Sequence, residues 1–549
     1  MKKNSLFLTL VIIVSSLFIG MTEVKAKSVT ESLKYIPVQD RGRIKPFDSF
    51  ARETLQLVYG KQKYKGKPAY DVIFTWYLVP DHWIKEKVIQ VNHNGLRESL
   101  KLDKEETYYT PMQLMQNERM SLFFKELASK QNSGDKLSGY YQAVQRLQSQ
   151  MSIFQAIRMG HGFLMIPGPE VKDRWRSVAQ YNEEETKRYY KMSDAYVATI
   201  SNLKTQETKK SSDGSQLTAA INEFIKANET NVRANYFDQS LLNSEVSYNN
   251  LQPFMWTWIL YLLGGVLFLL FFLFKNKHLY STALVFIIGG FLLHSYGFGI
   301  RVYLAGRPPV ANMYETLLWV PWGAIFFALI LEKIRRTNLL LFVASIAATL
   351  CMIITSLAPN VFDPSLQPLE PVLKSSFWLT THVLIITISY GAFFLAWGIG
   401  NIMMLFYLKG EEKHQAFLKE SAETIYKTLQ IGIVLLAAGI ILGGIWADYS
   451  WGRFWGWDPK ETWALIALLG YLALLHGRLV GWVKNFAMGA GSILAFSLVI
   501  MAWYGVNYVL GAGLHSYGFG VGGVEYVAFA IFVQFLFVAV VAVLRRSRK

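Results

Sequence analysis

Hydrophobic and polar positions divide this chain of 549 residues into two parts. Residues 27 to about 252 mix apolar and charged positions, whereas from Pro253 onward long apolar runs alternate with short polar breaks. A run of about 20 apolar residues is long enough to cross a bilayer as a helix. The pattern therefore predicts a mainly α-helical protein, with a soluble domain at 27–252 and a polytopic membrane domain at 253–549.

The membrane domain contains nine apolar runs, of which the third is short. We expect membrane helices at about 253–274, 279–300, 317–332, 337–357, 377–408, 428–446, 462–480, 486–506 and 524–544. The soluble domain has long polar–apolar patterns with few breaks at 110–160 and 170–235, so we expect it to be mostly helical.

The N-terminus has the features of a secretory signal peptide. Lys2 and Lys3 precede an apolar stretch from Leu6 to Met21, and the small residue Ala26 follows as a cleavage site. A signal peptide at 1–26 is the preferred interpretation, and a retained N-terminal anchor is the alternative. Both export the segment that follows, so the soluble domain is predicted to be extracytoplasmic.

Charges in the loops test this orientation independently. With the soluble domain outside, the inner segments carry 15 Lys and Arg residues and the outer loops carry 5. Those five are Arg301, Arg307, Lys374, Arg453 and Lys460. Cytoplasmic loops of membrane proteins are rich in Lys and Arg, so the bias predicts a multi-pass membrane protein with the soluble domain outside.

Composition excludes two classes of function. Much of the net charge of +16 lies in short loops beside apolar runs, which argues against a nucleic-acid partner. Cys351 is the single cysteine and lies in an apolar run, so the chain has no disulfide framework. Without a CxxCH motif, the chain cannot attach a c-type haem to itself through that motif.

Four histidines lie in or beside predicted membrane helices. His294 and His515 are each part of the heptapeptide LHSYGFG, which occurs at 293–299 and 514–520, in both cases at or just past the outer end of a helix. His382 lies near the outer end of the fifth helix, and His476 lies near the inner end of the seventh. An ionisable residue within the membrane is costly and is a candidate functional residue, although a hydrogen-bonded structural histidine is an equally good reading.

The segment between the sixth and seventh predicted helices is rich in tryptophan. Residues 446–463 contain five, at Trp446, Trp451, Trp455, Trp457 and Trp463, and the loop also carries Asp458 and Lys460. An interfacial aromatic belt is the simple explanation. A platform of indole faces also suits a large flat apolar ligand, and two facing histidines can hold a haem iron.

The segment WGRFWGWDPKETW at 451–463 resembles the WWD signature of the haem-handling proteins. The order of His382, the tryptophan-rich loop and His515 is similar to that of the CcsA-type (CcsBA-like) proteins of system II cytochrome c biogenesis. GRPPVANMYETLLW at 306–319 and LHGR at His476 resemble segments of the same family, and the resemblance covers about 280–549. IPVQDRGRIKPFDSFARETL at 36–55 resembles segments that precede the membrane domain in some fused synthases.

The resemblance implies a role for each candidate residue. His382 and His515 would be the outer axial ligands of haem b, which is a non-covalently bound substrate. His476 would be an inner ligand of a transit site, and His294 is a second candidate there. The platform would be formed by Trp451, Trp455, Trp457 and Asp458.

The implied activity is that of a holocytochrome c synthase (haem lyase) or its CcsA-type subunit. The protein would present haem to the CxxCH motif of apocytochrome c, whose thiols add to the haem vinyl groups. A separate CcsB/ResB-like subunit and thiol-reducing proteins are the other expected partners. Arg307 or Lys460 is a candidate partner of a haem propionate, and interface anchoring explains either equally well.

Two other functions use the same sequence features. A haem transporter or delivery protein without ligase activity would need the same histidines and tryptophans. A structural membrane scaffold would use the aromatic loop as an interface anchor, and it would tolerate the loss of any of the four histidines.

Overall fold

The computed structural model describes residues 28–133, 137–168, 173–205, 214–230, 238–358, 362–368, 376–510 and 523–548. The predicted signal peptide at 1–26 and the predicted ligand His515 lie outside these ranges. The chain divides into two compact units, residues 1–251 and 252–549.

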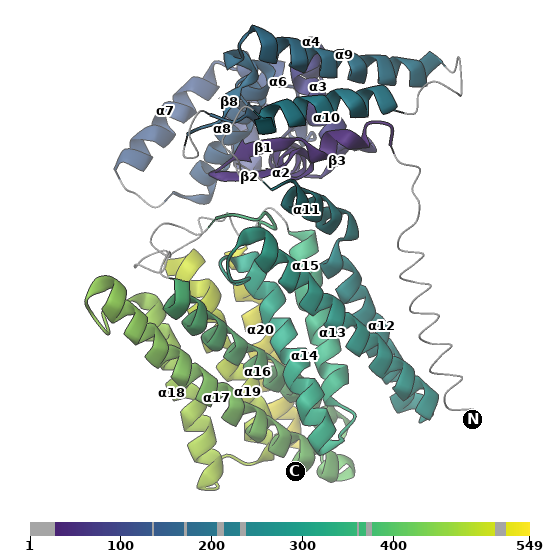
Figure 1. Ribbon diagram of the computed structural model, residues 1–549. Coiled ribbons are helices and arrows are strands. Elements are labelled where there is room, and N and C mark those ends of the chain that lie inside the picture. Colours follow the sequence, from purple (N-terminus) through teal and green to yellow (C-terminus); the bar gives the residue numbers. More distant parts are fainter. Residues whose placement is uncertain are drawn as a thin grey trace, which may run out of the picture. The chain divides into compact units, whose positions relative to one another are not determined.

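The first unit is mostly helical, as predicted, and it includes four small two-stranded antiparallel sheets (Figure 1). Its strands are β1 (Pro37–Asp40), β2 (Arg43–Pro46), β3 (Lys63–Tyr64), β4 (Lys67–Pro68), β5 (Ile89–Gln90), β6 (Tyr108–Tyr109), β7 (Leu164–Ile166) and β8 (Arg176–Ser177). Its α-helices are α2 (Phe47–Tyr59), α3 (Ala69–Leu78), α4 (Pro80–Trp83), α5 (Asn94–Ser99), α6 (Pro111–Met115), α7 (Arg119–Asn132), α8 (Gly139–Arg158), α9 (Glu183–Thr205), α10 (Ser215–Thr230) and α11 (Gln239–Leu251). Short 3-10 helices lie at Glu31–Tyr35 and Val178–Gln180.

The segment at 36–55 forms a hairpin followed by a helix. Arg41 and Gly42 connect β1 to β2 with φ angles of 49° and 75°. A two-residue turn with both φ angles positive matches the right-handed twist of a hairpin. Helix α2 follows at once and buries Phe47 and Phe50 in the aromatic core of the unit.

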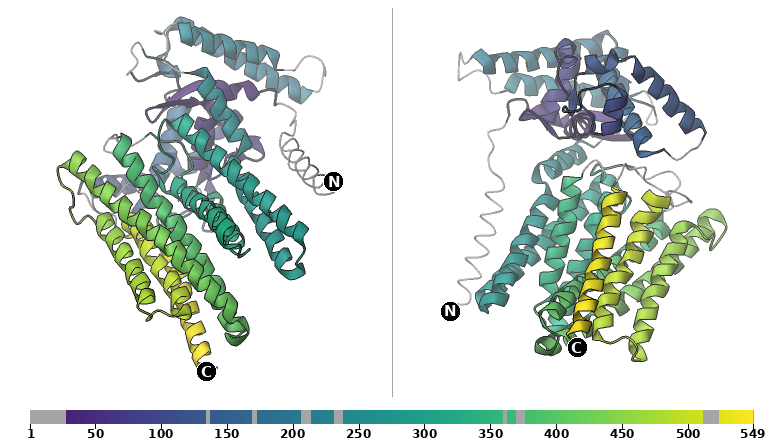
Figure 2. Two further views of the ribbon diagram at one scale, coloured as in Figure 1. Left: turned by 60° about the horizontal axis from the view of Figure 1, so that its bottom comes forward. Right: turned by 180° about the vertical axis from the view of Figure 1, so that it is seen from behind.

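The second unit is a helical bundle (Figures 1 and 2). Among the described residues, nine helices are long and apolar enough to cross a membrane, which confirms the predicted number. They are α12 (Pro253–Phe274), α13 (Lys277–Ala305), α14 (Met313–Arg335), α15 (Leu340–Leu357), α16 (Ser376–Lys409), α17 (Gln415–Trp451), α18 (Pro459–Leu479), α19 (Asn485–Ile500) and α20 (Val524–Ser547). A π-helix at Met501–Leu510 continues α19, and a short 3-10 helix at Glu412–His414 precedes α17.

Two helices extend well beyond the predicted limits. Helix α17 continues to Trp451, so Trp446 and Trp451 lie on its last turns and the connection to α18 is only Gly452–Asp458. The prediction stopped at 446 because polar residues follow, but polar residues can continue a helix beyond an apolar core. Helix α13 likewise continues to Ala305, so Arg301 is helical and not part of an outer loop.

Helix α16 packs against α14, α17, α19 and α20. Glycines permit its closest approaches. A Cβ atom on Gly391 would lie 3.0 Å from the backbone of α14, and one on Gly439 of α17 would lie 2.9 Å from the Cα atom of Ile386. Small residues at such crossings let membrane helices gain dispersion contacts that the surrounding lipid cannot replace.

Candidate functional site

A cavity lies at one end of the bundle, among α14, α16, α17, α18 and the π-helix. Its wall includes the segment from Pro308 to Met313 except Pro309, together with many apolar side chains. Its polar and aromatic lining includes His382, Trp446, Trp455, Lys460, Trp503 and Asn507. The cavity therefore gathers parts of the chain about 200 residues apart in sequence.

His382 projects from α16 into the wall of this cavity. Its Nδ1 lies 2.7 Å from the carbonyl oxygen of Gly439 on α17. A carbonyl oxygen can only accept a hydrogen bond, so Nδ1 carries the proton and Nε2 carries the lone pair. This is the tautomer that a metal-ligating histidine needs, with its other nitrogen held by a backbone carbonyl.

Gly443 makes room for the imidazole ring. A Cβ atom at this position would lie 2.5 Å from Cε1 and 2.8 Å from Nδ1 of His382. Gly443 is one turn of α17 beyond Gly439, so one glycine supplies the carbonyl and the next supplies the space. Both glycines line up on the face of α17 that meets α16.

The tryptophan-rich segment is divided between a buried and an exposed part. Trp446 is 1% exposed, packs with Trp378 and Val383, and meets Trp451 edge-on at 4.6 Å between ring centroids. Trp455 lines the cavity, whereas Trp457 is 71% exposed and contacts Trp455 edge-on at 5.9 Å. Trp457 also has a φ angle of 56°, in the left-handed region that non-glycine residues seldom occupy.

Asp458 has a local structural role at the start of α18. Its carboxylate accepts a hydrogen bond from the backbone N–H of Lys460 at 2.9 Å, and Glu461 accepts one from the N–H of Asp458 at 3.2 Å. Glu461 also accepts from the N–H of Gly456 and pairs with Arg453 at 3.1 Å. The Asp-Pro-Lys-Glu sequence thus forms a capping box that fixes the short connection carrying Trp455 and Trp457.

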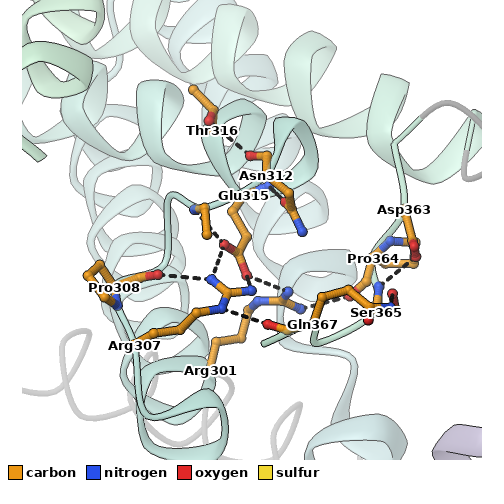
Figure 3. A network of polar contacts seen from close by, with 11 residues as sticks. Arg301, Arg307, Pro308, Asn312, Glu315, Thr316, Asp363, Pro364, Ser365 and Gln367 are labelled. Carbon is orange, nitrogen blue, oxygen red and sulfur yellow. Dashed lines mark hydrogen bonds and ion pairs between the residues drawn. The ribbon is translucent and has the colours of Figure 1, made fainter. Parts of the chain in front are cut away.

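A buried Arg–Glu–Arg cluster supports another part of the cavity wall (Figure 3). Glu315 accepts from Arg301 at 2.8 Å and from Arg307 at 2.7 Å, and these side chains are 1%, 2% and 4% exposed respectively. Glu315 also accepts from the backbone N–H of Ala311 at 2.9 Å. A charge buried this deeply requires a partner, so the cluster fixes the segment around Ala311 that lines the cavity.

The same two arginines bind a second segment. Arg301 donates to the carbonyl oxygen of Pro364 at 3.0 Å, and Arg307 donates to that of Gln367 at 2.8 Å (Figure 3). The cluster therefore holds two connecting segments together. Of the two predicted candidates for a propionate partner, Arg307 pairs with Glu315, and Lys460 lies on the cavity wall.

His294 lies apart from the cavity lining. Its side chain, on α13, is fully buried. Its Nδ1 lies 3.2 Å from the hydroxyl oxygen of Tyr261 on α12, and its ring stacks on Phe298. Its Nε2 has no hydrogen-bond partner in the described part of the chain. The prediction placed His294 near a helix end, but α13 continues eleven residues further, to Ala305.

His476 is also separate from the cavity lining and is exposed on α18. Its Nδ1 donates to the carbonyl oxygen of Leu472 at 2.8 Å, which leaves the lone pair on Nε2. Of the eight predicted site residues, the cavity wall includes His382 and Trp455. Trp451, Trp457 and Asp458 are not among the lining residues, and His515 lies outside the described residues.

Sequence reasoning missed three features of the site. Gly439 and Gly443 gave a weak signal, because glycines four residues apart mark close helix packing. Glu315 and Arg301 were detectable as ionisable residues beside apolar runs, but their pairing depends on the tertiary fold. Asn507 gave no signal beyond a polar residue within an apolar run.

Comparison with known proteins finds similarity to proteins of cytochrome c assembly. Residues 310–515 match the family described as cytochrome c assembly protein, a range that holds almost the whole cavity wall. The chain is similar to protein NrfI of Wolinella succinogenes, with 29% identity over 495 residues, covering 87% of this chain and 53% of NrfI. It thus spans about half the length of that relative.

Cytochrome c biogenesis proteins named CcsA match about two fifths of the chain. The CcsA of Guillardia theta is 35% identical over 250 residues, covering 40% of this chain and 80% of that protein. The CcsA of Prochlorococcus marinus strain NATL1A is 33% identical over 285 residues, covering 44% and 85%. Among solved structures, a cytochrome c haem lyase, CcmF, is 18% identical with a TM-score of 0.37, covering 54% of this chain and 50% of that one. On the CcsA matches, this chain belongs to the CcsA family of cytochrome c biogenesis proteins.

Proposed function

We propose that this chain binds haem b in the cavity beside His382 and presents it for thioether attachment to the CxxCH motif of apocytochrome c. It would act as a holocytochrome c synthase (haem lyase) or as its CcsA-type subunit. The observation that carries the proposal is the orientation of His382. A ligand-competent imidazole lies on a cavity wall that also holds indole rings and a lysine.

His382 and His515 are the axial ligands in this proposal. The hydrogen bond from Nδ1 to Gly439 fixes the ring, so Nε2 is the nitrogen that would meet the iron. The π-helix whose Trp503 and Asn507 line the same cavity ends at Leu510, five residues before His515. This closeness in sequence supports His515 as the second ligand.

The remaining lining suits the other parts of a porphyrin. Trp446 and Trp455 offer flat apolar surface, and the capping box of Asp458 and Glu461 holds the connection that carries Trp455. Lys460, a cation on the cavity wall, would pair with a propionate.

The proposed reaction needs positioning more than acid or base catalysis. Each cysteine thiol adds across a vinyl group: its sulfur bonds to one vinyl carbon and its proton ends on the other. The C=C π bond and the S–H bond break, and no electrons are gained or lost. Holding both vinyl groups beside the two thiols lowers the entropic part of the barrier.

His476 is the proposed ligand of a transit site. It is exposed on α18 with its lone pair on Nε2. An exposed histidine within a membrane helix is costly in lipid, which supports a second, CcsB/ResB-like subunit against this surface. The dense packing around His294 supports a structural role there in place of the predicted transit role.

The proposed location is the bacterial inner membrane, with the cavity on the periplasmic side. Positive charges in the sequence favour this orientation. The first unit would then lie outside the cytoplasm, where apocytochrome c and the thiol-reducing proteins that keep its CxxCH reduced would meet it.

The visible spectrum of the detergent-purified protein tests the proposal. We expect reduced bis-histidine haem bands in the parent, bands weakened in His382→Ala and restored by added imidazole, and unchanged bands in the control His414→Ala. A colourless parent from haem-replete cells would overturn the haem assignment. Co-expression with an apocytochrome c distinguishes a synthase from a haem delivery protein, because only the synthase gives covalently attached haem.

A further inference from the structure

The π-helix at Met501–Leu510 holds two polar groups that the proposed haem site does not use. Trp503 and Asn507 lie one turn apart and both line the cavity. Stretches of π-helix are rare and frequently occur at functional sites, because the wide turn changes the direction of side chains. The two side chains are therefore candidates for contact with a ligand.

The orientation of the Asn507 amide is fixed by its neighbours. Its Nδ2 donates to the carbonyl oxygen of Trp503 at 2.7 Å and lies 3.7 Å from the Sδ atom of Met313. Its Oδ1 is buried and has no hydrogen-bond partner in the described part of the chain, and Asn507 as a whole is 7% exposed. A buried acceptor without a partner costs free energy, so it points to a ligand that donates.

Trp503 supplies the complementary group. Its Nε1–H is likewise buried and has no partner within the ranges that the structure describes. An indole N–H can only donate. The wall thus offers one unused acceptor and one unused donor from adjacent turns of one helix.

Haem b satisfies only half of this pair. Its propionates are carboxylates at neutral pH and only accept hydrogen bonds, and its pyrrole nitrogens bind the iron. No group on haem b can donate to Oδ1 of Asn507. A backbone peptide group has both a donating N–H and an accepting carbonyl oxygen.

We propose that Asn507 Oδ1 and Trp503 Nε1 bind a peptide group of the polypeptide substrate and hold its backbone against the haem cavity. The identity of that polypeptide as an apocytochrome c rests on the proposed function. The chemistry of the pair is independent of the proposed function, because it needs only an acceptor for a peptide N–H and a donor for a peptide carbonyl.

The chain contains a matched control for each residue. Asn401 on α16 donates through Nδ2 to the carbonyl oxygen of Trp397 at 3.0 Å, the same bond four residues back, but it does not line the cavity. Trp258 on α12 has a buried Nε1 without a partner in the described residues and also lies outside the lining. Asn401→Leu and Trp258→Phe therefore make the same chemical changes away from the proposed site.

The test measures affinity for a peptide on the detergent-purified full chain. The probe is a fluorescent synthetic peptide whose CxxCH cysteines are replaced by serine, so that it binds without reacting. We expect Asn507→Leu and Trp503→Phe each to weaken binding roughly tenfold, the size expected for one buried hydrogen bond. Asn401→Leu and Trp258→Phe should bind as the parent does, and haem absorbance should be retained in all four.

N-methylation of the peptide, one position at a time, identifies the bond. We expect one position where methylation weakens binding to the parent but not to Asn507→Leu, because the hydrogen bond is already absent there. Unchanged peptide affinity in both cavity variants would overturn the proposal and leave a bound water as the partner of Asn507.

A second outcome would also overturn it. Loss of haem bands in Asn507→Leu or Trp503→Phe, with normal bands in the controls, would assign the pair to haem. A colourless parent that still binds the peptide through Asn507 would contradict the proposed haem function but support this site, so the two failures are distinguishable. Should Asn507→Leu fail to fold, Trp503→Phe alone tests the pair, since it keeps an aromatic ring and removes the N–H.

Discussion

Two histidines of the bundle, His294 on α13 and His382 on α16, have different surroundings in space. Near His294, glycines of the same helix admit aromatic rings: a Cβ atom on Gly290 would meet the ring of Tyr261, and one on Gly297 would meet that of Phe254. Near His382, Gly443 of the neighbouring helix admits the imidazole itself, and the space beyond is the cavity. One histidine fills a core, and the other lines an opening.

The difference shows what makes a membrane histidine available to a ligand. Both rings use Nδ1 for a hydrogen bond, to a hydroxyl in one case and to a carbonyl in the other. Aromatic side chains from α12 contact the ring of His294, whereas the ring of His382 lines a cavity. Availability is therefore decided by residues far away in sequence, which an intramembrane histidine alone does not reveal.

Removing Glu315, the centre of the buried ion cluster, should have the largest effect on the cavity region around His382. Glu315→Ala leaves Arg301 and Arg307 buried without their counter-charge, and we expect a loss of about 3–5 kcal/mol in unfolding free energy. Thermal unfolding in detergent measures it. The control Glu423→Ala breaks an exposed pair with Arg335, 3.6 Å long, and should cost less than about 1 kcal/mol. Equal stability of the two variants would contradict the supporting role of the cluster.

Filling the space beside His382 should make its surroundings resemble the close-packed surroundings of His294. Gly443→Ala places a methyl group 2.5 Å from the ring, so we expect a displaced imidazole, weakened haem bands and a stability loss of about 1–3 kcal/mol. Gly289→Ala on α13 is the matched control, because a Cβ atom there has no neighbour within 4 Å. Normal haem bands in Gly443→Ala would show that the ligand lies elsewhere.

Glu315 and Gly443, the residues changed in these two variants, also show how much of the site could be predicted from the sequence. Apolar runs predicted nine helices with limits mostly within a few residues, because hydropathy alone determines which segments enter lipid. His382 and Trp455 were predicted from the resemblance and lie on one cavity wall. The paired charges and the glycines at the α16–α17 crossing were not predicted, since each depends on a partner from another helix.

The limits of α13 and α17 show a second reason for error. A hydropathy pattern ends where polar residues begin, whereas a helix ends where its hydrogen bonding ends. Arg301 reads as a loop charge in sequence, yet it is helical and 2% exposed because Glu315 neutralises it. The tryptophan-rich segment was misread in the same way at Trp446 and Trp451.

Replacing His294, the close-packed histidine, tests the other half of the comparison. His294→Phe keeps a ring against Phe298 but leaves the Tyr261 hydroxyl without its partner, so we expect a loss of about 1 kcal/mol and unchanged haem bands. The double variant with Tyr261→Phe should recover much of this loss, because both polar groups are then removed. Thermal unfolding and visible spectra measure both. Disappearance of a haem signal that survives in His382→Ala would instead assign His294 to a transit site.

The smallest effect is expected at Trp457, in the connection between α17 and α18. Trp457 holds a left-handed backbone with φ of 56° although it is largely exposed, a conformation that costs a non-glycine residue about 1–2 kcal/mol. Trp457→Gly should therefore be as stable as the parent or slightly more so, while the yield of haem attachment falls a few-fold through loss of the ring beside Trp455. Arg336→Gly is the matched control, because this exposed residue has a φ of 53° at the end of α14. It should show the same small gain in unfolding temperature with full attachment.

If both variants kept full attachment, the indole of Trp457 would be a consequence of the turn and not part of the platform. A loss of stability in Trp457→Gly larger than about 1 kcal/mol would show that the ring stabilises the connection, beyond the strain that glycine relieves.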